Sequence, residues 1–134
     1  MFLPEESTFI IAEAGVNHNG DVGLARKLID VAAECGADVV KFQTFKADRL
    51  ASHEAPKAEY QKETTDTKES QYEMLQRLEL SPDMHRDLMA YCEERRILFM
   101  SSPFDEESAD LLEELGVDVD IVLYMKEPPD ELLL

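Results

Sequence analysis

The amino-acid sequence predicts an α/β fold in which parallel strands alternate with helices. Short β-rich apolar runs alternate along the 134 residues with longer segments in which apolar residues recur every three or four positions. An order of strand, helix, strand, helix, strand, helix and strand favours right-handed crossovers and a parallel sheet. With 44% apolar residues, a chain of this length can bury one core.

The first strand is predicted at residues 8–12, a β-rich apolar run that ends before Glu13 and a glycine-containing turn. It is expected to be buried, with its carboxyl end opening into a site. Asp21 can cap the helix that follows, and Gly36 ends that helix. The run at 37–45 predicts the second strand, whose polar side chains lie toward its carboxyl end.

A long polar stretch at residues 46–70 follows the second strand. It is rich in Lys, Glu, Thr, Ala and Asp and has little periodicity. Loops of this length inside compact domains are usually functional or disordered. Helical periodicity returns at residues 72–78, and a second helix begins with Ser81 as its cap and Pro82 at its first position.

The last predicted elements are a strand at 97–100, an acidic helix at 105–115 that Gly116 ends, and a fourth strand at 117–123. The acidic helix is most simply interpreted as a solvated face. Two architectures fit this order of elements: a doubly wound open sheet and a (β/α)8 barrel. Four strands in 134 residues would be half of a barrel, whose usual length is about 250 residues.

The net charge restricts the class of partner. With 30 acidic and 13 basic side chains, the formal net charge is −17, and a chain this acidic repels phosphate backbones and anionic lipid surfaces. Nucleic acid and membrane are therefore not expected as partners. The sequence has no basic region before its first apolar run and no apolar stretch long enough to span a bilayer, which predicts a cytoplasmic protein.

The cysteines, histidines and glycines do not form a known ligand motif. Cys35 and Cys92 fall in helical patterns and are expected to be free thiols. His18, His53 and His85 lie far apart in the chain, without the spacing of metal ligands. The segment AGVNHNGD contains neither a GxGxxG fingerprint nor a Walker A loop, so nucleotide binding has no support.

Polar side chains gather at the carboxyl ends of the three predicted strands, where a parallel α/β sheet binds its ligand. They are Glu13, Asn17, His18 and Asn19, then Lys41, Gln43 and Thr44, then Ser101 and Ser102. Together they offer an acid or base, a cation for a carboxylate or phosphate, amide donors and hydroxyls. We interpret this set as a site for a small, polar, phosphorylated or carboxylated metabolite.

Five blocks of the sequence, in this order, resemble the N-acetylneuraminate (sialic acid) synthase family, which includes the legionaminic acid synthases. They are FIIAEAGVNHNGD, GADVVKFQTFKADRL, APKAEYQ, ESQYEMLQRLELS and FMSSPFDEESADLLEELGV, within residues 9–117. The resemblance implies an enzyme that condenses phosphoenolpyruvate with an N-acetylated aminosugar such as N-acetylmannosamine, using a divalent metal (Mn or Mg), and releases phosphate. It also implies a homodimer whose (β/α)8 barrel is followed by an antifreeze-like domain.

The resemblance assigns roles to individual residues. Glu13 matches the glutamate that the family places in the site on strand one, and Lys41 matches the lysine that contacts phosphoenolpyruvate. Gln43 matches the glutamine that touches the aminosugar, and Ser102 keeps a hydroxyl for the phosphate. A looser match places two residues in the loop that covers the sugar: Thr65 and Tyr72.

The segment after Val117 departs from the family. Where the family continues with a K-I-x-S-G-E strand, an ungapped alignment places Ile121, Tyr124 and Lys126 at its three functional positions. The strands with the metal-binding histidines and the antifreeze-like domain have no counterpart in residues 1–134, so this chain is expected to carry no metal ligands.

These departures lead to three hypotheses. In the first, residues 1–134 form an N-terminal part of a synthase barrel, with an atypical tail at 118–134, and this part is inactive alone and self-associates through its open strand edges. In the second, the chain is a non-catalytic binding module for a sugar phosphate or carboxylate. In the third, two copies pair as half-barrels to close a ring.

Overall fold

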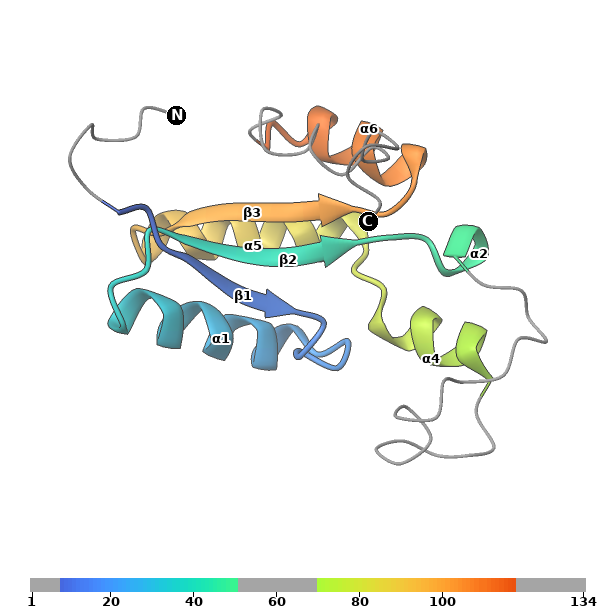
Figure 1. Ribbon diagram of the computed structural model, residues 1–134, viewed down its shortest axis with the longest axis horizontal. Helices are drawn as coiled ribbons and strands as arrows, with labels where there is room; N and C mark the ends of the chain where they lie inside the picture. The colour runs from blue at the N-terminus through green and yellow to red at the C-terminus, as the bar shows by residue number, and fades with distance from the viewer. Residues whose placement is uncertain (1–7, 51–69, 118–134) are drawn as a thin grey trace, which may run out of the picture.

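Three parallel strands form a sheet in the order β1-β2-β3 (Figure 1). The structure is a computed structural model that describes residues 8–50 and 70–117. The strands are β1 (Ile11–Gly15), β2 (Val39–Thr44) and β3 (Leu98–Pro103), and both neighbouring pairs are parallel. The parallel α/β arrangement predicted from the sequence is confirmed for this part of the chain.

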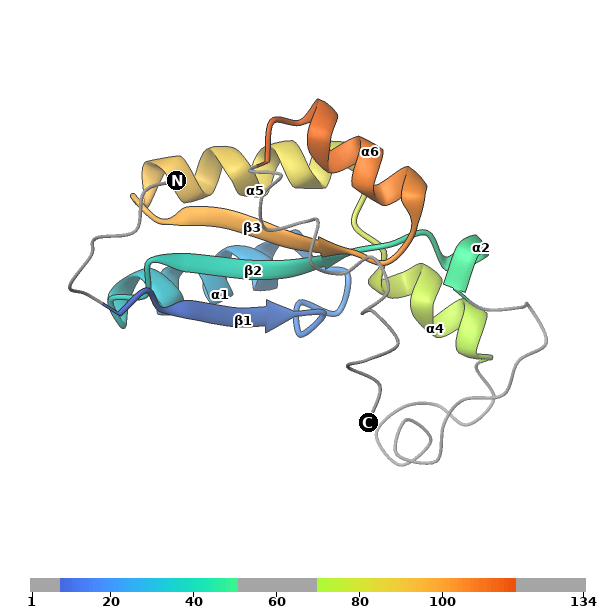
Figure 2. The ribbon, with the colours of Figure 1, turned by 45° about the horizontal axis from the view of Figure 1, so that its top comes forward.

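The described residues include five helices that pack around one face and the carboxyl end of the sheet. They are α1 (Val22–Glu34), α2 (Ala47–Leu50), α4 (Gln71–Leu78), α5 (Pro82–Glu94) and α6 (Glu106–Glu114). Figures 1 and 2 show α1 and α5 running along the same side of the sheet, whereas α2 and α4 lie beyond the carboxyl ends of the strands. Helices on one face, rather than on both, are the arrangement of a barrel segment and not of a doubly wound sheet.

The helices begin where the predicted capping residues stand. Asp21 accepts a hydrogen bond from the Leu24 N–H, and Ser81 accepts one from the Met84 N–H with Pro82 at the first helical position. Each such cap satisfies a backbone donor that the helix leaves unpaired. The same arrangement recurs at Asp105, which caps α6.

The core lies between the sheet and the two long helices. Ile29 of α1, Leu88 of α5 and Phe42 of β2 are fully buried and pack in one cluster. On the other face of the sheet, Ile11 and Leu98 are 45% and 50% exposed, on either side of Val39 in the same row of the register. The helices therefore cover one face of the described sheet. On the other face the edge strands expose apolar side chains, although Val39, Met100 and Ser102 on that face are buried.

Acidic side chains at the ends of α4 and α6 accept hydrogen bonds from the segment that follows β2. The Lys46 N–H donates to Asp105 Oδ2 at 2.8 Å, and the Ala47 N–H donates to Glu79 Oε2 at 3.1 Å. Glu79 Oε1 also accepts a hydrogen bond from Lys46 Nζ at 3.2 Å. Because charged acceptors hold these backbone groups, the segment leaving β2 turns at once into α2.

The strand boundaries predicted from the sequence differ from those of the structure. β1 covers Ile11–Gly15 instead of 8–12, and its register with β2 begins at the pair Ile11 and Val39. β2 covers Val39–Thr44 instead of 37–45. Ile10 is exposed rather than buried, and its N–H donates to Asp38 Oδ2. β3 begins at Leu98 and continues beyond Met100 to Pro103, since residues 42–44 of β2 supply partners for residues 101–103.

The loop predicted at 46–70 includes the short helix α2 near its start. The acidic helix predicted at 105–115 is observed at Glu106–Glu114, and its glutamates are exposed as expected. Leu112 on its inner side is buried. The predicted strand at 117–123 lies outside the described residues except for Val117, which is buried and in no strand. Among the described helices, none has the length and apolar character needed to cross a membrane.

The two thiols differ in accessibility. Both cysteines are free: Cys35 follows α1 and is exposed, whereas Cys92 is buried in the core, and burial raises the pKa of its thiol to about 12. Because the thiolate is the reactive form, iodoacetamide should label one thiol per native chain and two in urea. Mass spectrometry of the labelled chain measures this, and rapid native labelling of Cys92 would contradict the described core.

Candidate active site

Four of the residues singled out from the sequence lie on the face of the sheet that α1 and α5 leave uncovered. Glu13 of β1 pairs in the register with Lys41 of β2, and Gln43 of β2 pairs with Ser102 of β3. Alternate residues of a strand share a face, so Lys41 and Gln43 point to the same side. The sheet thus brings these four polar side chains into two adjacent rows near its carboxyl edge.

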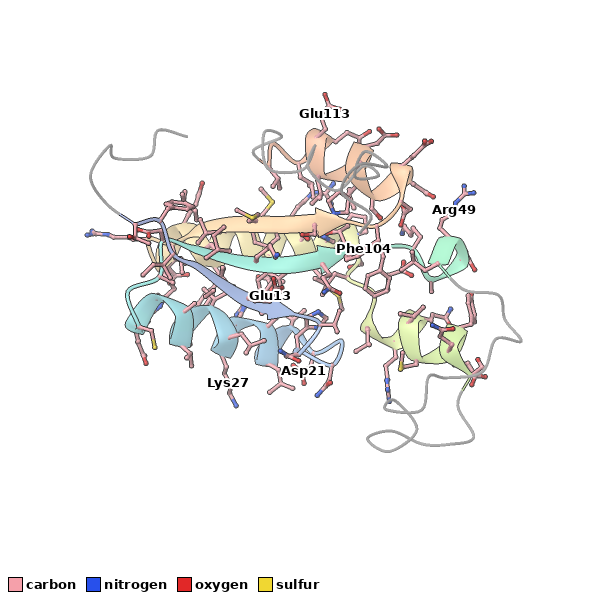
Figure 3. All side chains as sticks on the ribbon, viewed as in Figure 1. Glu13, Asp21, Lys27, Arg49, Phe104 and Glu113 are labelled. Atoms are coloured by element: carbon pink, nitrogen blue, oxygen red, sulfur yellow. The ribbon has the colours of Figure 1, made fainter. Side chains whose placement is uncertain are left out.

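An ion pair joins the first of these rows. Lys41 Nζ lies 2.6 Å from Glu13 Oε2, and the two side chains are 30% and 50% exposed. Figure 3 shows Glu13 close to the carboxyl end of β1. Exposed pairs of this kind contribute only about 0–1 kcal/mol to stability, so opening this pair would cost the fold little free energy.

Gly15 belongs to the site as well, although the sequence analysis did not select it. Its φ is +56°, and a Cβ at this position would lie 3.4 Å from Glu13 Oε1 and 3.7 Å from Gln43 Nε2. The carboxylate and the amide therefore converge over a residue without a side chain. The only signal in the sequence is a glycine two positions after Glu13.

Thr44 and Ser101 point to the opposite, helix-covered side. Both are buried, and Thr44 Oγ1 lies 2.6 Å from Ser101 Oγ and 2.8 Å from His85 Nε2. The sequence analysis included both residues in the polar site at the strand ends, and this was wrong for their side chains. Each is one residue away from a position on the site face, and strands alternate their faces.

The turn after β1 holds Asn17, His18 and Asn19. The turn exposes Asn17 and Asn19, whereas His18 is 0% exposed and packs near Phe42 with ring centroids 6.1 Å apart. Its Nδ1 accepts the Gly20 N–H at 2.9 Å. Burial, and secondarily repulsion by His85, lowers the pKa of His18. A role in substrate binding for Asn17 and His18 stays a prediction.

Tyr72 lies on α4, where its hydroxyl donates to Asp48 Oδ1 of α2 at 2.8 Å. This hydrogen bond, with a smaller contribution from burial, raises the pKa of the Tyr72 phenol. The structure therefore connects Tyr72 to the helices beyond the strand ends. Thr65, the other residue expected over the sugar, lies outside the described residues.

The described residues do not by themselves fit a divalent metal. Within 8–50 and 70–117, no three His, Cys, Asp or Glu side chains converge as ligands. The Glu13 carboxylate on the site face is already paired with the Lys41 ammonium group, which repels a cation.

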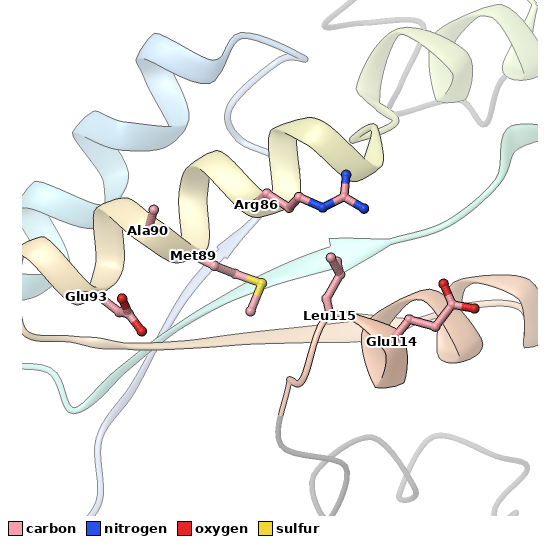
Figure 4. A pocket seen from close by; sticks show the side chains of 6 residues that line it. All are labelled: Arg86, Met89, Ala90, Glu93, Glu114 and Leu115. Carbon is pink, nitrogen blue, oxygen red and sulfur yellow. The ribbon is translucent and has the colours of Figure 1, made fainter.

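A separate hollow of about 520 Å³ lies between α5 and α6 (Figure 4). It contains none of the residues selected from the sequence. Its lining residues are Arg86, Met89, Ala90, Glu93, Glu114 and Leu115. Because these residues belong to the helical layer, the hollow is not part of the site at the strand ends.

The fold and the four clustered side chains define a parallel α/β protein with a polar site at the carboxyl edge of its strands, consistent with part of a (β/α)8 barrel. The chain belongs to the NeuB family, which matches residues 28–121. It is related to sialic acid and legionaminic acid synthases of carbohydrate biosynthesis.

Three relatives support this placement. The N,N'-diacetyllegionaminic acid synthase of Campylobacter jejuni is 54% identical over 114 residues, 85% of this chain and 34% of its own length. The synthase of the same name from Legionella pneumophila is 56% identical over 109 residues, 81% of this chain and 31% of its own. The crystal structure of N-acetylneuraminic acid synthetase from Leptospira borgpetersenii is 30% identical, has a TM-score of 0.68 and matches 87% of this chain and 38% of its own. The chain spans about a third of the length of the curated relatives it matches.

Proposed function

We propose that this chain is part of a synthase that condenses phosphoenolpyruvate with an N-acetylated aminosugar, such as N-acetylmannosamine or its diacetylated relative, to give a sialic acid and phosphate. One observation supports this most strongly: Glu13, Lys41, Gln43 and Ser102 share the uncovered face of the sheet near the carboxyl end. A cation, a carboxylate, an amide and a hydroxyl are the groups that an anionic enol and a sugar require.

Each side chain has a proposed role in this reaction. Lys41 binds the carboxylate or phosphate of phosphoenolpyruvate, and the Ser102 hydroxyl donates to the phosphate. Gln43 holds the sugar through its amide. Glu13 is placed to exchange a proton with the sugar when the enol carbon forms a bond to the aldehyde carbon. Water then adds to the carbon that carries the phosphate, and the phosphate leaves.

The complete activity is proposed to need parts of the protein beyond the described residues. These include the remaining barrel units, the ligands of a divalent metal and the second subunit of a homodimer. The exposed Ile11 and Leu98 on the site face support contact with further protein, because apolar side chains in one row of a sheet are normally covered. By the same reasoning, we propose that residues 1–134 alone self-associate and do not turn over substrate.

Removal of the Lys41 charge tests the anion site. In a calorimetric titration with phosphoenolpyruvate, Lys41→Met should weaken binding about 10–100-fold, because a hydrogen bond to a charged group contributes about 1.5–3 kcal/mol. Lys27→Met is the matched control, since Lys27 is an exposed lysine that projects from α1 away from the sheet in Figure 3. Equal affinity of the two variants would contradict the proposed role of Lys41.

Titration with both substrates, combined with a phosphate-release assay, tests whether the described residues form a substrate site. Binding of phosphoenolpyruvate and N-acetylmannosamine without release of phosphate is expected if residues 1–134 are part of a synthase, and it is also what a binding module would show. Loss of turnover in a full-length relative that carries the same lysine substitution would support a catalytic use of this site within the family. Absence of binding to either compound would contradict a site formed by the described residues.

A further inference from the structure

A network of buried hydrogen bonds connects β3, β2 and the start of α5 behind the candidate site. Ser101 Oγ lies 2.6 Å from Thr44 Oγ1, Thr44 Oγ1 lies 2.8 Å from His85 Nε2, and His85 Nδ1 lies 2.8 Å from the Ser81 carbonyl oxygen. Thr44, His85 and Ser101 are at most 2% exposed. None of these three side chains has a role in the proposed chemistry.

Chemistry fixes the direction of each hydrogen bond when His85 is neutral. The Ser81 carbonyl can only accept, so His85 Nδ1 carries the ring proton and Nε2 is an acceptor. Thr44 therefore donates its hydroxyl proton to His85, and Ser101 donates to Thr44. The neutral form is favoured because burial lowers the pKa of His85, and the Lys46 charge lowers it further against the opposing hydrogen bond to Ser81.

This hydrogen-bond network lies directly behind the candidate site. Thr44 directly follows Gln43, and Ser101 directly precedes Ser102, the residue that pairs with Gln43 in the register. Adjacent residues of a strand point to opposite faces. The hydrogen bond between Thr44 and Ser101 on the covered face therefore joins β2 to β3 next to Gln43 and Ser102, which lie on the opposite face.

We propose that His85 is a positioning residue: by accepting the Thr44 hydroxyl proton, it holds the ends of β2 and β3 so that Gln43 and Ser102 lie side by side. Since Ser81 also caps α5, the same hydrogen bonds set the first turn of this helix against the strand ends. The inference about geometry does not need the identity of the substrate, whereas its effect on phosphoenolpyruvate rests on the proposed function.

Two variants of His85 test the proposal. His85→Leu removes the acceptor, whereas the side-chain oxygen of His85→Gln can still accept from Thr44. The readouts are the NMR signals of the Gln43 side-chain amide and the Ser102 backbone amide, and the affinity for phosphoenolpyruvate. We expect His85→Leu to shift both signals and to weaken binding about tenfold, and His85→Gln to restore both.

A core variant outside this hydrogen-bond network controls for a general loss of stability. Ile29→Val removes one buried methyl group from α1 and should leave both signals and the affinity unchanged. Unchanged signals in His85→Leu, or equal shifts in Ile29→Val, would overturn the proposal. If His85→Leu does not fold, Thr44→Val compared with Thr44→Ser asks the same question from the donor side. If the wild-type chain binds no phosphoenolpyruvate, the proposed function fails while the two NMR signals still decide the positioning role.

Discussion

Replacement of Gly20 by alanine is expected to destabilise the fold by about 2–5 kcal/mol, the largest effect of any glycine substitution in the described residues. Gly20 has a φ of +76°, and a Cβ there would overlap the carbonyl oxygen of Arg77. That oxygen belongs to the backbone of α4 and cannot rotate away. The turn after β1 and helix α4 would have to separate, so the substitution would disturb the segment that holds His18.

Gly36→Ala is the matched control for this experiment. Gly36 has nearly the same backbone conformation, with a φ of +78°, but a Cβ there would meet no atom within 4 Å. Only the conformational cost of about 1–2 kcal/mol is then expected. Urea unfolding followed by circular dichroism measures both variants, and an equal loss of stability would show that the Arg77 carbonyl does not press on Gly20.

Acidification below about pH 6.5, the ordinary pKa of histidine, is expected to destabilise the chain. His18 and His85 are both fully buried, and burial lowers the pKa of each in the folded state. The unfolded chain therefore binds more protons than the folded chain as the pH falls from 6.5 toward the folded pKa values. Stability is complete above the unfolded pKa and falls by about 1.4 kcal/mol per pH unit for each histidine that stays neutral in the fold.

Urea midpoints measured between about pH 7.5 and 5 test this dependence, because this range lies above the ordinary pKa of a carboxyl group, which is about 4. His85→Gln should keep the hydrogen bond from Thr44 and lose about half of the slope. A midpoint that does not change over this range in the wild-type chain would contradict the buried, neutral state of the two imidazoles.

The sequence predicted the features that depend on local chemistry. Asp21 and Ser81 are recognisable as caps because a short polar side chain before a periodic segment satisfies the helix N–H groups. The pair Lys41 and Gln43 was placed together because a spacing of two keeps side chains on one face of a strand. Their proximity to Glu13 and Ser102 followed from the parallel order of strands.

Features that depend on tertiary contacts were not predictable. β2 is buried on both sides along much of its length, so the sequence VVKFQT gives no sign of which face carries the helices, and Thr44 was assigned to the wrong one. The burial of His18 depends on Phe42, which is distant in the chain. The start of β1 was missed because strand pairing, which begins at Ile11 and Val39 in the register, does not follow the apolar character of residues 8–10.

The alternation along β2 also has a consequence for how relatives of this chain can differ in specificity. Val40, Phe42 and Thr44 are held by helices and by buried hydrogen bonds, whereas Lys41 and Gln43 stand on the uncovered face. We therefore expect a substitution at Lys41 or Gln43 to affect folding little, and a substitution at an even-numbered neighbour to affect it strongly. Under the proposed function, single substitutions along one strand can then alter ligand recognition while the fold is kept.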